Sequence, residues 1–335
     1  MSYKQVIITE FGGPEVMKVV ENATLPEPAA GEVRIKVQAT SACFTDTMVR
    51  KGIYYGFKKK PPFPPGYDVV GVVDKVGTAV SDLKAGQTVA DLTVSDAYSE
   101  YICRPASSVV PVPDGLDPAE AVSLVLSYVT AYQMLHRAAK VQPGQTILIH
   151  GAGGAVGTAL LELGKLLDLK MVGTASKSKH ELVASLGGTP VDYRSEDFVE
   201  RVGVGVVDAA FDAIGGDNFK RSLQTLKKGG TLVAYGFYNN SMGRGGNVPL
   251  EYMKVKVWDL WPNGRSATFY SIGDMRKKQP DWFREDLTAL FGLLAQGKIK
   301  PAIERRMKLT DAVEAHQLIE KAAVKGRIVL LVEDR

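Results

Sequence analysis

The order of apolar and polar positions divides the chain into a β-rich segment, a segment of alternating strands and helices, and a mixed C-terminal segment. Residues 33–37 alternate apolar and charged, which predicts a strand with one side facing solvent. Residues 69–73 are a continuous run rich in Val, which predicts a more buried strand. Frequent Gly and Pro turn signals surround both runs, and this combination is typical of a compact barrel or sandwich.

The pattern changes at Asp117, where an Asp-Pro pair and early acidic residues predict the start of a helix. From Gln145 onward, short apolar runs alternate with helical segments. The predicted strands are 146–150, 171–175, 191–193, 206–212, 231–235 and 255–260. Six strands separated by helices predict a parallel sheet covered on both faces, in a doubly wound dinucleotide-binding fold.

The alternation stops after residue 261. Residues 281–296 and 310–323 have the spacing of amphipathic helices, and residues 327–332 form a final apolar strand. This last strand has no local partner in the sequence pattern. We therefore expect it to return to the N-terminal β segment.

Composition limits the classes of function. The chain has 335 residues, of which 45% are hydrophobic and 23% charged, so it is long enough for two folded domains and is not typical of disorder. The net charge of +4 is too balanced to indicate a nucleic-acid partner. No apolar run has the length of a membrane span, and the N-terminus does not resemble a signal peptide. These features predict a cytoplasmic protein with no membrane or nucleic-acid partner.

A glycine-rich loop lies between a predicted strand and a predicted helix. Residues 150–157 read His-Gly-Ala-Gly-Gly-Ala-Val-Gly, which places Ala152, Gly154 and Gly157 at the three small-residue positions of a dinucleotide-binding turn. The first position is Ala instead of Gly. The start of the following helix offers free N–H groups to a pyrophosphate, so Ala152, Gly153, Gly154, Ala155, Val156 and Gly157 are predicted to bind the cofactor.

The residues after the second strand select the kind of dinucleotide. An NAD site places Asp or Glu there to hold the ribose 2′-hydroxyl, whereas this chain has Ser176, Lys177 and Lys179. A hydroxyl and two ammonium groups suit a 2′-phosphate. The sequence therefore predicts NADPH as the cofactor.

Taken together, these residues resemble the medium-chain dehydrogenase/reductase superfamily, most closely its zinc-free quinone oxidoreductase and enoyl reductase branch. The likeness rests on residues 66–73, 129–132, the glycine loop, 173–174, 192–194 and 297–301. It implies an α/β protein with a GroES-like catalytic domain at residues 1–124, a Rossmann NADPH-binding domain at 125–264, and a return to the catalytic domain at 265–335. It also implies an active site in the interdomain cleft and a homodimer formed through the last Rossmann strand, here about 255–260.

The zinc-dependent branch of the same superfamily fits less well. Cys43-Phe44-Thr45-Asp46 resembles its first ligand motif, but Tyr67 stands where that branch has a His ligand, and Leu126 falls near the third ligand position. Catalytic zinc requires three protein ligands, so no metal is predicted. Cys43 is interpreted either as a small buried hydrophobe or as a thiol that lines the cofactor site.

The resemblance implies hydride transfer from NADPH to a quinone or to the C=C bond of an α,β-unsaturated carbonyl. Residues 52–55 resemble the segment whose Tyr is the proton donor in related enoyl reductases, so Tyr54 is the predicted donor and Tyr55 the alternative. Both could also be packing aromatics in a loop. Asp46 is predicted to orient the loops around the nicotinamide.

Further cofactor contacts are implied by position. These are Thr130, Tyr193 beside the 2′-phosphate, Ile214, Gly236, Phe237 and Arg327. Two other functions stay open: an enoyl-CoA or carrier-protein thioester reductase, in which Lys58–Lys60 would meet a phosphate, and a non-catalytic, crystallin-like NADPH-binding protein.

Overall fold

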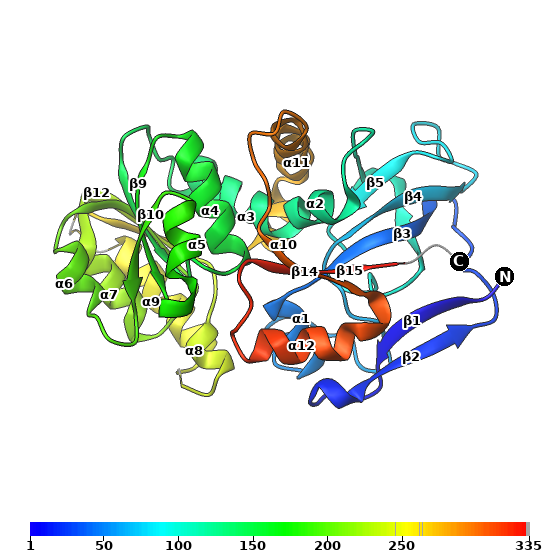
Figure 1. The fold of residues 1–335 in the computed structure, drawn as a ribbon, viewed down its shortest axis with the longest axis horizontal. Helices are drawn as coiled ribbons and strands as arrows, with labels where there is room; N and C mark the ends of the chain where they lie inside the picture. Colours follow the sequence, from blue (N-terminus) through cyan, green and yellow to red (C-terminus); the bar gives the residue numbers. More distant parts are fainter. Residues whose placement is uncertain (245, 261, 263, 333–335) are drawn as a thin grey trace. The chain divides into compact units, whose positions relative to one another are not determined.

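The computed structural model describes residues 1–332 except 245, 261 and 263, and the chain divides into two compact units (Figure 1). Unit 1 comprises Met1–Leu126 and Phe283–Arg335, and unit 2 comprises Ser127–Trp282. The sequence resemblance implies a return to the first unit at residue 265. The observed boundary comes later because the strand and helix that follow residue 265 belong to unit 2.

Unit 2 contains a six-stranded sheet in which every neighbouring pair is parallel. Its strands are β8 (Thr146–His150), β9 (Lys170–Ala175), β10 (Gly188–Asp192), β11 (Val207–Asp212), β12 (Leu226–Ala234) and β13 (Ser266–Phe269). They lie in the order β10-β9-β8-β11-β12-β13, which is the doubly wound order of a Rossmann fold. The carboxyl ends of these strands form the edge at which such sheets bind ligands.

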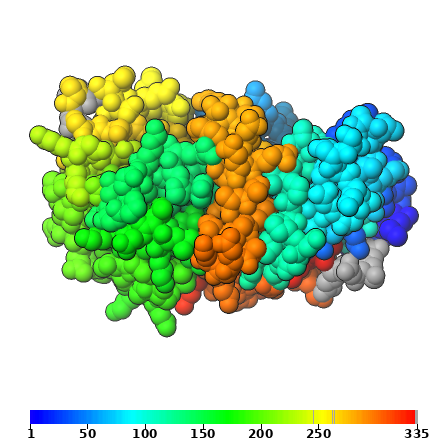
Figure 2. All heavy atoms as spheres, turned by 90° about the horizontal axis from the view of Figure 1, so that it is seen from above, coloured from blue at the N-terminus to red at the C-terminus, as the bar shows by residue number. Residues whose placement is uncertain are grey.

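The helices of unit 2 connect these strands. They are α3 (Val129–Gln133), α4 (Ala155–Leu166), α5 (His180–Ser185), α6 (Phe198–Val202), α7 (Asp217–Thr225), α8 (Tyr238–Ser241), α9 (Val248–Leu260) and α10 (Ile272–Lys278). Figure 2 shows one face of this unit, coloured green to yellow. A buried cluster that includes Ala210 of β11, Leu232 of β12 and Phe219 of α7 fills the space between strands and helices.

The prediction of a strand at residues 255–260 is wrong. These residues form the second half of α9, and the sixth strand of the sheet is β13. Val255 is buried on the helix face that packs near β13, whereas Val257 and Leu260 are exposed. Burial of one helical face has overridden the β-propensity of this Val- and Trp-containing run.

Unit 1 contains a sheet of seven strands and a separate two-stranded sheet. Its strands are β1 (Tyr3–Ile8), β2 (Met17–Asn22), β3 (Glu32–Ala42), β4 (Val69–Val76), β5 (Thr88–Asp91), β6 (Tyr101–Pro105), β7 (Val110–Pro111), β14 (Ile303–Lys308) and β15 (Arg327–Leu331). Its main helices are α1 (Phe44–Arg50), α2 (Pro118–Ser123), α11 (Pro280–Ala295) and α12 (Ala312–Glu320). The C-terminal strand β15 pairs antiparallel with β3 and parallel with β14, so it also has the nearby partner that its sequence pattern did not indicate.

The expected solvent-facing side of residues 33–37 is largely covered. Arg34 is 9% exposed because its guanidinium is paired with Asp74 and Glu27. The charged side chain of this strand therefore lies in an ion-pair cluster and not in open solvent.

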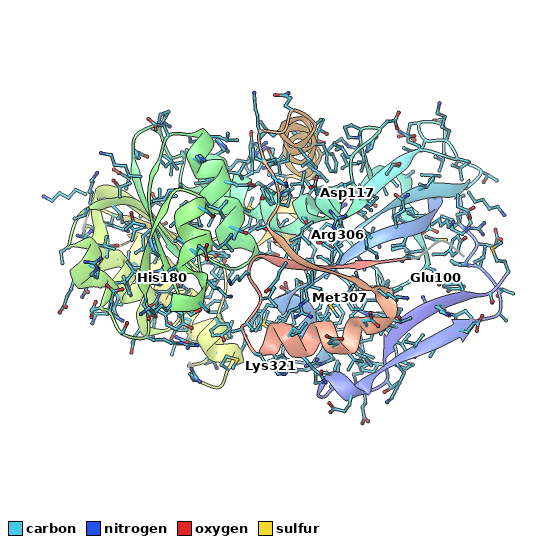
Figure 3. The ribbon with its side chains drawn as sticks, in the orientation of Figure 1. Glu100, Asp117, His180, Arg306, Met307 and Lys321 are labelled. Carbon is cyan, nitrogen blue, oxygen red and sulfur yellow. The ribbon has the colours of Figure 1, made fainter. Side chains whose placement is uncertain are left out.

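The helix start at Asp117 forms as the sequence predicts. The Asp117 side chain accepts a hydrogen bond from the Glu120 N–H at 2.9 Å, and Arg306 Nη1 approaches its other oxygen at 2.7 Å (Figure 3). In this way α2 is tied to β14 within unit 1. Among the helices of the described residues, none combines the length and apolar character needed to cross a lipid bilayer.

Candidate functional site

The glycine loop of unit 2 is held against the first turn of α4. Gly157 lies in that turn, and a Cβ atom there would come within 2.6 Å of the Ala152 Cα and also too close to the Gly151 carbonyl oxygen. Only glycine permits this approach of helix to loop. Gly154 is the N-cap of α4, and because it has no side chain it cannot cap the N–H groups of the first turn.

The Ala at the first small-residue position is accommodated by a glycine in the neighbouring strand. Ala152 is fully buried, and its Cβ would lie 2.5 Å from a Cβ added to Gly173 of β9. Because Gly173 has no side chain, the loop keeps its tight packing although Ala replaces Gly. The sequence contains this compensating glycine, but only the sheet register brings it opposite Ala152.

The predicted 2′-phosphate residues lie where β9 ends. Ser176 precedes the short 3-10 helix at Lys177–Lys179, and Lys177 is exposed. The aliphatic part of Lys179 crosses Gly153, where an added Cβ would come within 2.7 Å of its Cδ. The structure thus places Lys179 directly over the glycine loop. His180, which starts α5, is labelled in Figure 3 and marks this edge.

Tyr193 follows the adjacent strand β10 and is 54% exposed. The guanidinium of Arg194 lies 5.7 Å from the Tyr193 ring centroid, which adds a cation that the sequence analysis did not select. The Arg194 N–H donates to Asp192 and is the main cause that lowers the pKa of that carboxyl. Since β9 and β10 are parallel neighbours, their ends bring Lys177, Lys179 and Arg194 to the same edge of the sheet.

A buried polar network supports the next turn. Asp212 at the end of β11 accepts hydrogen bonds from the N–H groups of Ile214 and Gly215 and from the side chains of Asn218 and Ser222. His150 Nε2 lies 3.0 Å from Ser222 Oγ. Burial is the main cause that lowers the pKa of His150, so the imidazole is neutral and Nε2 donates to the serine. The residue that precedes the glycine loop is thereby linked to the turn at Ile214.

The remaining predicted cofactor residues of unit 2 differ in how far their backbone groups and side chains are exposed. The Ile214 carbonyl also accepts from Asn239, so its backbone groups are used within the turn. Phe237 stacks on Phe269 with ring centroids 4.9 Å apart, which points its side chain into the core. Gly236 is partly exposed, and Thr130 is 6% exposed in α3.

In unit 1, Cys43 and Asp46 form a capping box at the start of α1. The Cys43 N–H donates to Asp46 Oδ2 at 3.0 Å, and the Asp46 N–H faces the cysteine side chain. Asp46 is fully buried, and burial is the main cause that raises its pKa to about 7. Burial likewise raises the pKa of the Cys43 thiol well above its ordinary value, so this cysteine is a thiol at neutral pH.

The two candidate proton donors lie in different surroundings. The Tyr54 hydroxyl is 3.0 Å from the hydroxyl of Tyr67, and the two rings meet edge to face. Tyr55 is 72% exposed. Burial and then the neighbouring Tyr54 raise the pKa of Tyr67 well above its ordinary value. Tyr67 therefore keeps its proton at neutral pH, and it is a neutral hydrogen-bond partner for the Tyr54 hydroxyl.

Arg327 is 3% exposed and already has partners in unit 1. Its Nη2 lies 3.2 Å from Asp68 Oδ2, and its Nη1 donates to the Ser123 carbonyl at 2.7 Å. Asp68 also accepts from the Ser41 hydroxyl and N–H. The contacts shown for Arg327 thus hold β15, β3 and α2 together.

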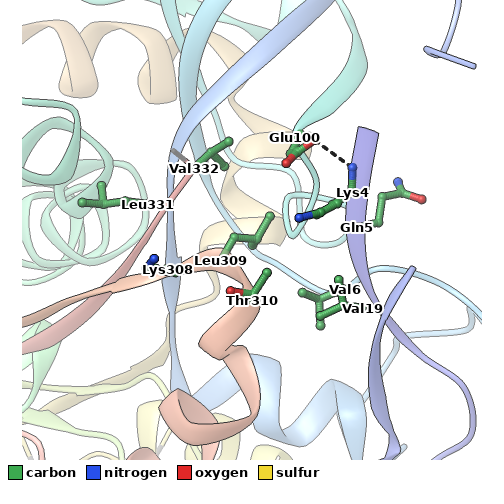
Figure 4. A pocket seen from close by; sticks show the side chains of 10 residues that line it. All are labelled: Lys4, Gln5, Val6, Val19, Glu100, Lys308, Leu309, Thr310, Leu331 and Val332. Carbon is green, nitrogen blue, oxygen red and sulfur yellow. Dashed lines mark hydrogen bonds between the residues drawn. The ribbon is translucent and has the colours of Figure 1, made fainter. Parts of the chain in front are cut away.

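One cavity in each unit lies apart from these residues. In unit 1, a cavity of about 270 Å³ is lined by Lys4, Gln5, Val6, Val19, Glu100, Lys308, Leu309, Thr310, Leu331 and Val332 (Figure 4). In unit 2, a cavity of about 360 Å³ near β13 is lined by residues that include Arg137, Lys140, Tyr270 and Trp282. None of the predicted catalytic or cofactor-binding residues lines either of these two cavities.

The described residues can also be searched for side chains that could bind a metal ion together. Across the described residues, no three His, Cys, Asp or Glu side chains come together as a metal site would require. At the position where a His ligand would be expected, Tyr67 offers a protonated phenol.

Comparisons with known proteins cover both units. Residues 29–114 match the family model of the alcohol dehydrogenase GroES-like domain, and residues 186–330 match that of a zinc-binding dehydrogenase. The chain is 32% identical over 343 residues to the human synaptic vesicle membrane protein VAT-1 homolog-like, covering 98% of this chain and 81% of that protein. It is 29% identical over 341 residues to mouse quinone oxidoreductase, covering 98% of each.

Solved structures give the same relationship. The crystal structure of Escherichia coli quinone oxidoreductase complexed with NADPH matches with a TM-score of 0.86 at 28% identity, covering 98% of this chain and 99% of that chain. The match includes the GroES-like part and the parallel-sheet part of the chain.

Proposed function

Since the chain belongs to the medium-chain dehydrogenase/reductase superfamily, in its zinc-free quinone oxidoreductase branch, we propose that it is an NADPH-dependent reductase of quinones or of α,β-unsaturated carbonyls. The observation that carries the choice of cofactor is the group of cations and hydroxyls at the ends of β9 and β10. Ser176, Lys177, Lys179 and Tyr193 gather there, and no carboxylate stands at the position that would hold a 2′-hydroxyl.

The residues of unit 2 fit a phosphorylated dinucleotide. The glycine loop leaves no room for a Cβ at Gly157, and it presents the N-terminus of α4 without a capping side chain. Gly153 to Gly157 would hold the pyrophosphate, and Lys177 and Lys179 would pair with the 2′-phosphate. Thr130, Gly236, the backbone at Ile214 and Phe237, and the unit 1 residues Cys43 and Arg327 are proposed as further contacts.

When bound, NADPH would supply the hydride, and the protein would supply the proton. Negative charge develops on the carbonyl oxygen of the substrate as its double bond is reduced, and a hydrogen-bond donor at that oxygen lowers the barrier. We assign this donor to Tyr54, with the exposed Tyr55 as the alternative. Tyr67 holds the Tyr54 hydroxyl through their 3.0 Å contact, and Asp46 fixes the start of α1 near that pair.

The proposed reaction does not use a metal ion. The reason is the identity of the side chains: Tyr67 and Leu126 stand at two of the three expected ligand positions, and catalytic zinc requires three protein ligands. The experiment is metal analysis of the purified active protein, and stoichiometric zinc would overturn this part of the proposal.

The substrate class is tested by oxidation of NADPH with three acceptors in parallel: 1,4-benzoquinone, trans-2-hexenal and crotonyl-CoA. Turnover of either of the first two supports the proposal. Preferential turnover of crotonyl-CoA would favour a thioester reductase, in which the exposed lysines of residues 58–60 meet a phosphate, although Lys59 is already paired with Asp96. Tight binding of NADPH without turnover of any acceptor would favour a non-catalytic binding protein.

We further propose a homodimer formed through the edge of the unit 2 sheet. The edge strand is β13, which replaces the predicted segment 255–260 in this role. On the neighbouring helix α9, Leu250, Met253, Val257 and Leu260 recur at spacings of three and four residues and are all at least half exposed. Light scattering coupled to size-exclusion chromatography tests this, and a monomer at micromolar concentration would contradict it.

A further inference from the structure

Four buried polar side chains of unit 2 connect two loops at the carboxyl ends of the sheet strands. They are His150 at the end of β8, Thr174 near the end of β9, Asp212 at the end of β11 and Ser222 on α7. We call these four residues the His150 network. Burying polar groups is costly unless they are hydrogen-bonded, so the partners of each side chain show what the network holds in place.

The carboxylate of Asp212 fixes the turn that follows β11. Its Oδ1 accepts from the N–H groups of Ile214 and Gly215 at 2.8 and 3.4 Å. Its Oδ2 accepts from Asn218 Nδ2 at 2.8 Å and from the Ser222 hydroxyl at 2.7 Å. A hydroxyl has a single hydrogen, so the Ser222 oxygen is left only as an acceptor for any other neighbour.

This restriction places the hydrogens of His150. Its Nε2 lies 3.0 Å from the Ser222 oxygen, so Nε2 carries a hydrogen and donates it. Burial is the main cause that lowers the pKa of His150, so the ring is neutral and Nδ1 has no hydrogen. Because Nδ1 lies 3.1 Å from Thr174 Oγ1, the Thr174 hydroxyl is the donor in that contact. The hydrogen bonds of the network therefore all point toward Asp212.

Thr174 connects the network to the glycine loop. Its hydroxyl oxygen accepts from the N–H of Gly151 at 3.4 Å, and its carbonyl accepts from the N–H of Ala152 at 3.0 Å. The Gly151 carbonyl accepts in turn from the N–H of Gly154 at 3.0 Å, just before α4 begins. The first residues of the loop are therefore held from β9 by both a side chain and the backbone.

We infer that Thr174, His150 and Ser222 are positioning residues that join the glycine loop to the turn after β11 in one directed hydrogen-bond network. Removing one hydroxyl leaves a buried donor or acceptor without its partner, and this should loosen both ends of the network. The effect on the cofactor rests on the proposed function, because the glycine loop and the turn at Ile214 are both proposed to contact NADPH. The link between the two turns does not.

Hydrogen–deuterium exchange of the cofactor-free protein tests the link directly. Ser222→Ala changes only a side chain on α7, but it removes the group between His150 and Asp212. We expect amide exchange in residues 150–157 to become about fivefold faster or more. Thr225→Val is the matched control, because Thr225 is also buried on α7 and its hydroxyl donates to a backbone carbonyl. It should leave exchange in residues 150–157 unchanged.

Two substitutions of Thr174 separate the hydrogen bond from packing. Thr174→Val keeps the branched side chain and removes the hydroxyl, whereas Thr174→Ser keeps the hydroxyl and removes a methyl group. We expect Thr174→Val to bind NADPH about fivefold more weakly or worse, and Thr174→Ser to stay within about twofold of the wild type. An equal loss in both variants would mean that packing alone is responsible, and it would overturn the positioning role.

The hydrogen position on His150 can be measured in the wild type itself. In the ¹⁵N spectrum of the protein, with this ring assigned through its own backbone, Nε2 should be protonated and Nδ1 unprotonated at neutral pH. A hydrogen on Nδ1 would overturn the inference. So would unchanged exchange in residues 150–157 of Ser222→Ala, or an equal increase in Thr225→Val.

The exchange and ¹⁵N measurements need neither NADPH nor an acceptor. Their failure leaves the proposed reductase standing. A protein that binds no NADPH would contradict the proposed function, and the exchange measurements would still decide whether the two turns are linked.

Discussion

Replacing Gly157 with Ala tests whether the glycine loop depends on its close contact with α4. The added Cβ would lie 2.6 Å from the Ala152 Cα, about 0.8 Å short of the 3.4 Å at which ordinary contact begins. The obstructing atoms are backbone, so a side-chain rotation cannot relieve the clash. Overpacking of this kind costs about 1–3 kcal/mol, and the better helix propensity of Ala returns about 0.5–1 kcal/mol. The central values of these two ranges leave a net loss of about 1 kcal/mol for unit 2, and the ranges allow up to about 2.5 kcal/mol.

The matched control is Gly273→Ala in the first turn of α10. Gly273 is also a helical glycine of unit 2, but a Cβ there would meet nothing within 4 Å. This variant should gain about 0.5–1 kcal/mol through helix propensity alone. The two substitutions are chemically identical, so the difference between them measures the loop contact.

The assay is denaturant unfolding followed by tryptophan fluorescence, together with NADPH titration. All three tryptophans, Trp258, Trp261 and Trp282, lie within the sequence of unit 2, so their emission follows this unit. Gly157→Ala should unfold at lower denaturant and bind NADPH at least tenfold more weakly, because the loop and the helix N-terminus move apart. Equal stability and equal NADPH affinity in the two variants would refute the reasoning.

Three further predictions follow from the site. The double variant Lys177→Ala/Lys179→Ala should weaken NADPH binding about tenfold or more and leave NADH binding unchanged. As a control, replacing the exposed Lys165 with Ala should change the affinity for neither cofactor. An equal loss of affinity for both cofactors in the double variant would contradict the 2′-phosphate assignment. Tyr54→Phe should slow enone reduction by about 10²-fold with little change in NADPH affinity, and a slowing seen instead in Tyr55→Phe would transfer the donor role to that residue. Burial and then Arg50 lower the pKa of His316 to about 3, so between about pH 6.5 and pH 3 only the unfolded chain binds this proton. The difference in unfolding free energy between the wild type and His316→Gln, measured at pH 7 and pH 5, should therefore fall toward low pH by about 1.4 kcal/mol per pH unit below about pH 6.5, and a difference that does not change with pH would contradict this.

The parts of the fold that depend on consecutive residues were predictable from the sequence. The strand, glycine loop and helix at residues 146–166 combine a buried run, small residues and a helix start in consecutive sequence, and each signal supports the others. Residues 255–260 carry an equally apolar run but form a helix, because the face that contains Val255 is buried against the sheet edge. A short apolar run does not distinguish these two outcomes, since the deciding contact is tertiary.

The site was predictable only where its residues are near one another in sequence. The residues at the end of β9 could be assigned from spacing, but Arg194 and the support that Asp212 gives to Ile214 depend on sheet order and loop geometry. The side chains of Arg50 and His316 are hydrogen-bonded although the two residues are 266 positions apart in the sequence. No spacing rule indicates such a pair, because helix α12 reaches α1 only through the return of the C-terminal segment to unit 1.

Tyr67 links two features that the sequence did not connect: the loss of a metal ligand and the choice of a proton donor. Its identity was read only as the loss of a metal ligand, whereas Tyr54 was selected by resemblance as a proton donor. In the structure, the phenol that replaces the ligand is the hydrogen-bond partner of that donor, at 3.0 Å. A phenol with a raised pKa keeps its proton at neutral pH, so it can hold Tyr54 without introducing charge. Tyr67 therefore both removes an expected zinc ligand and holds the proposed proton donor Tyr54.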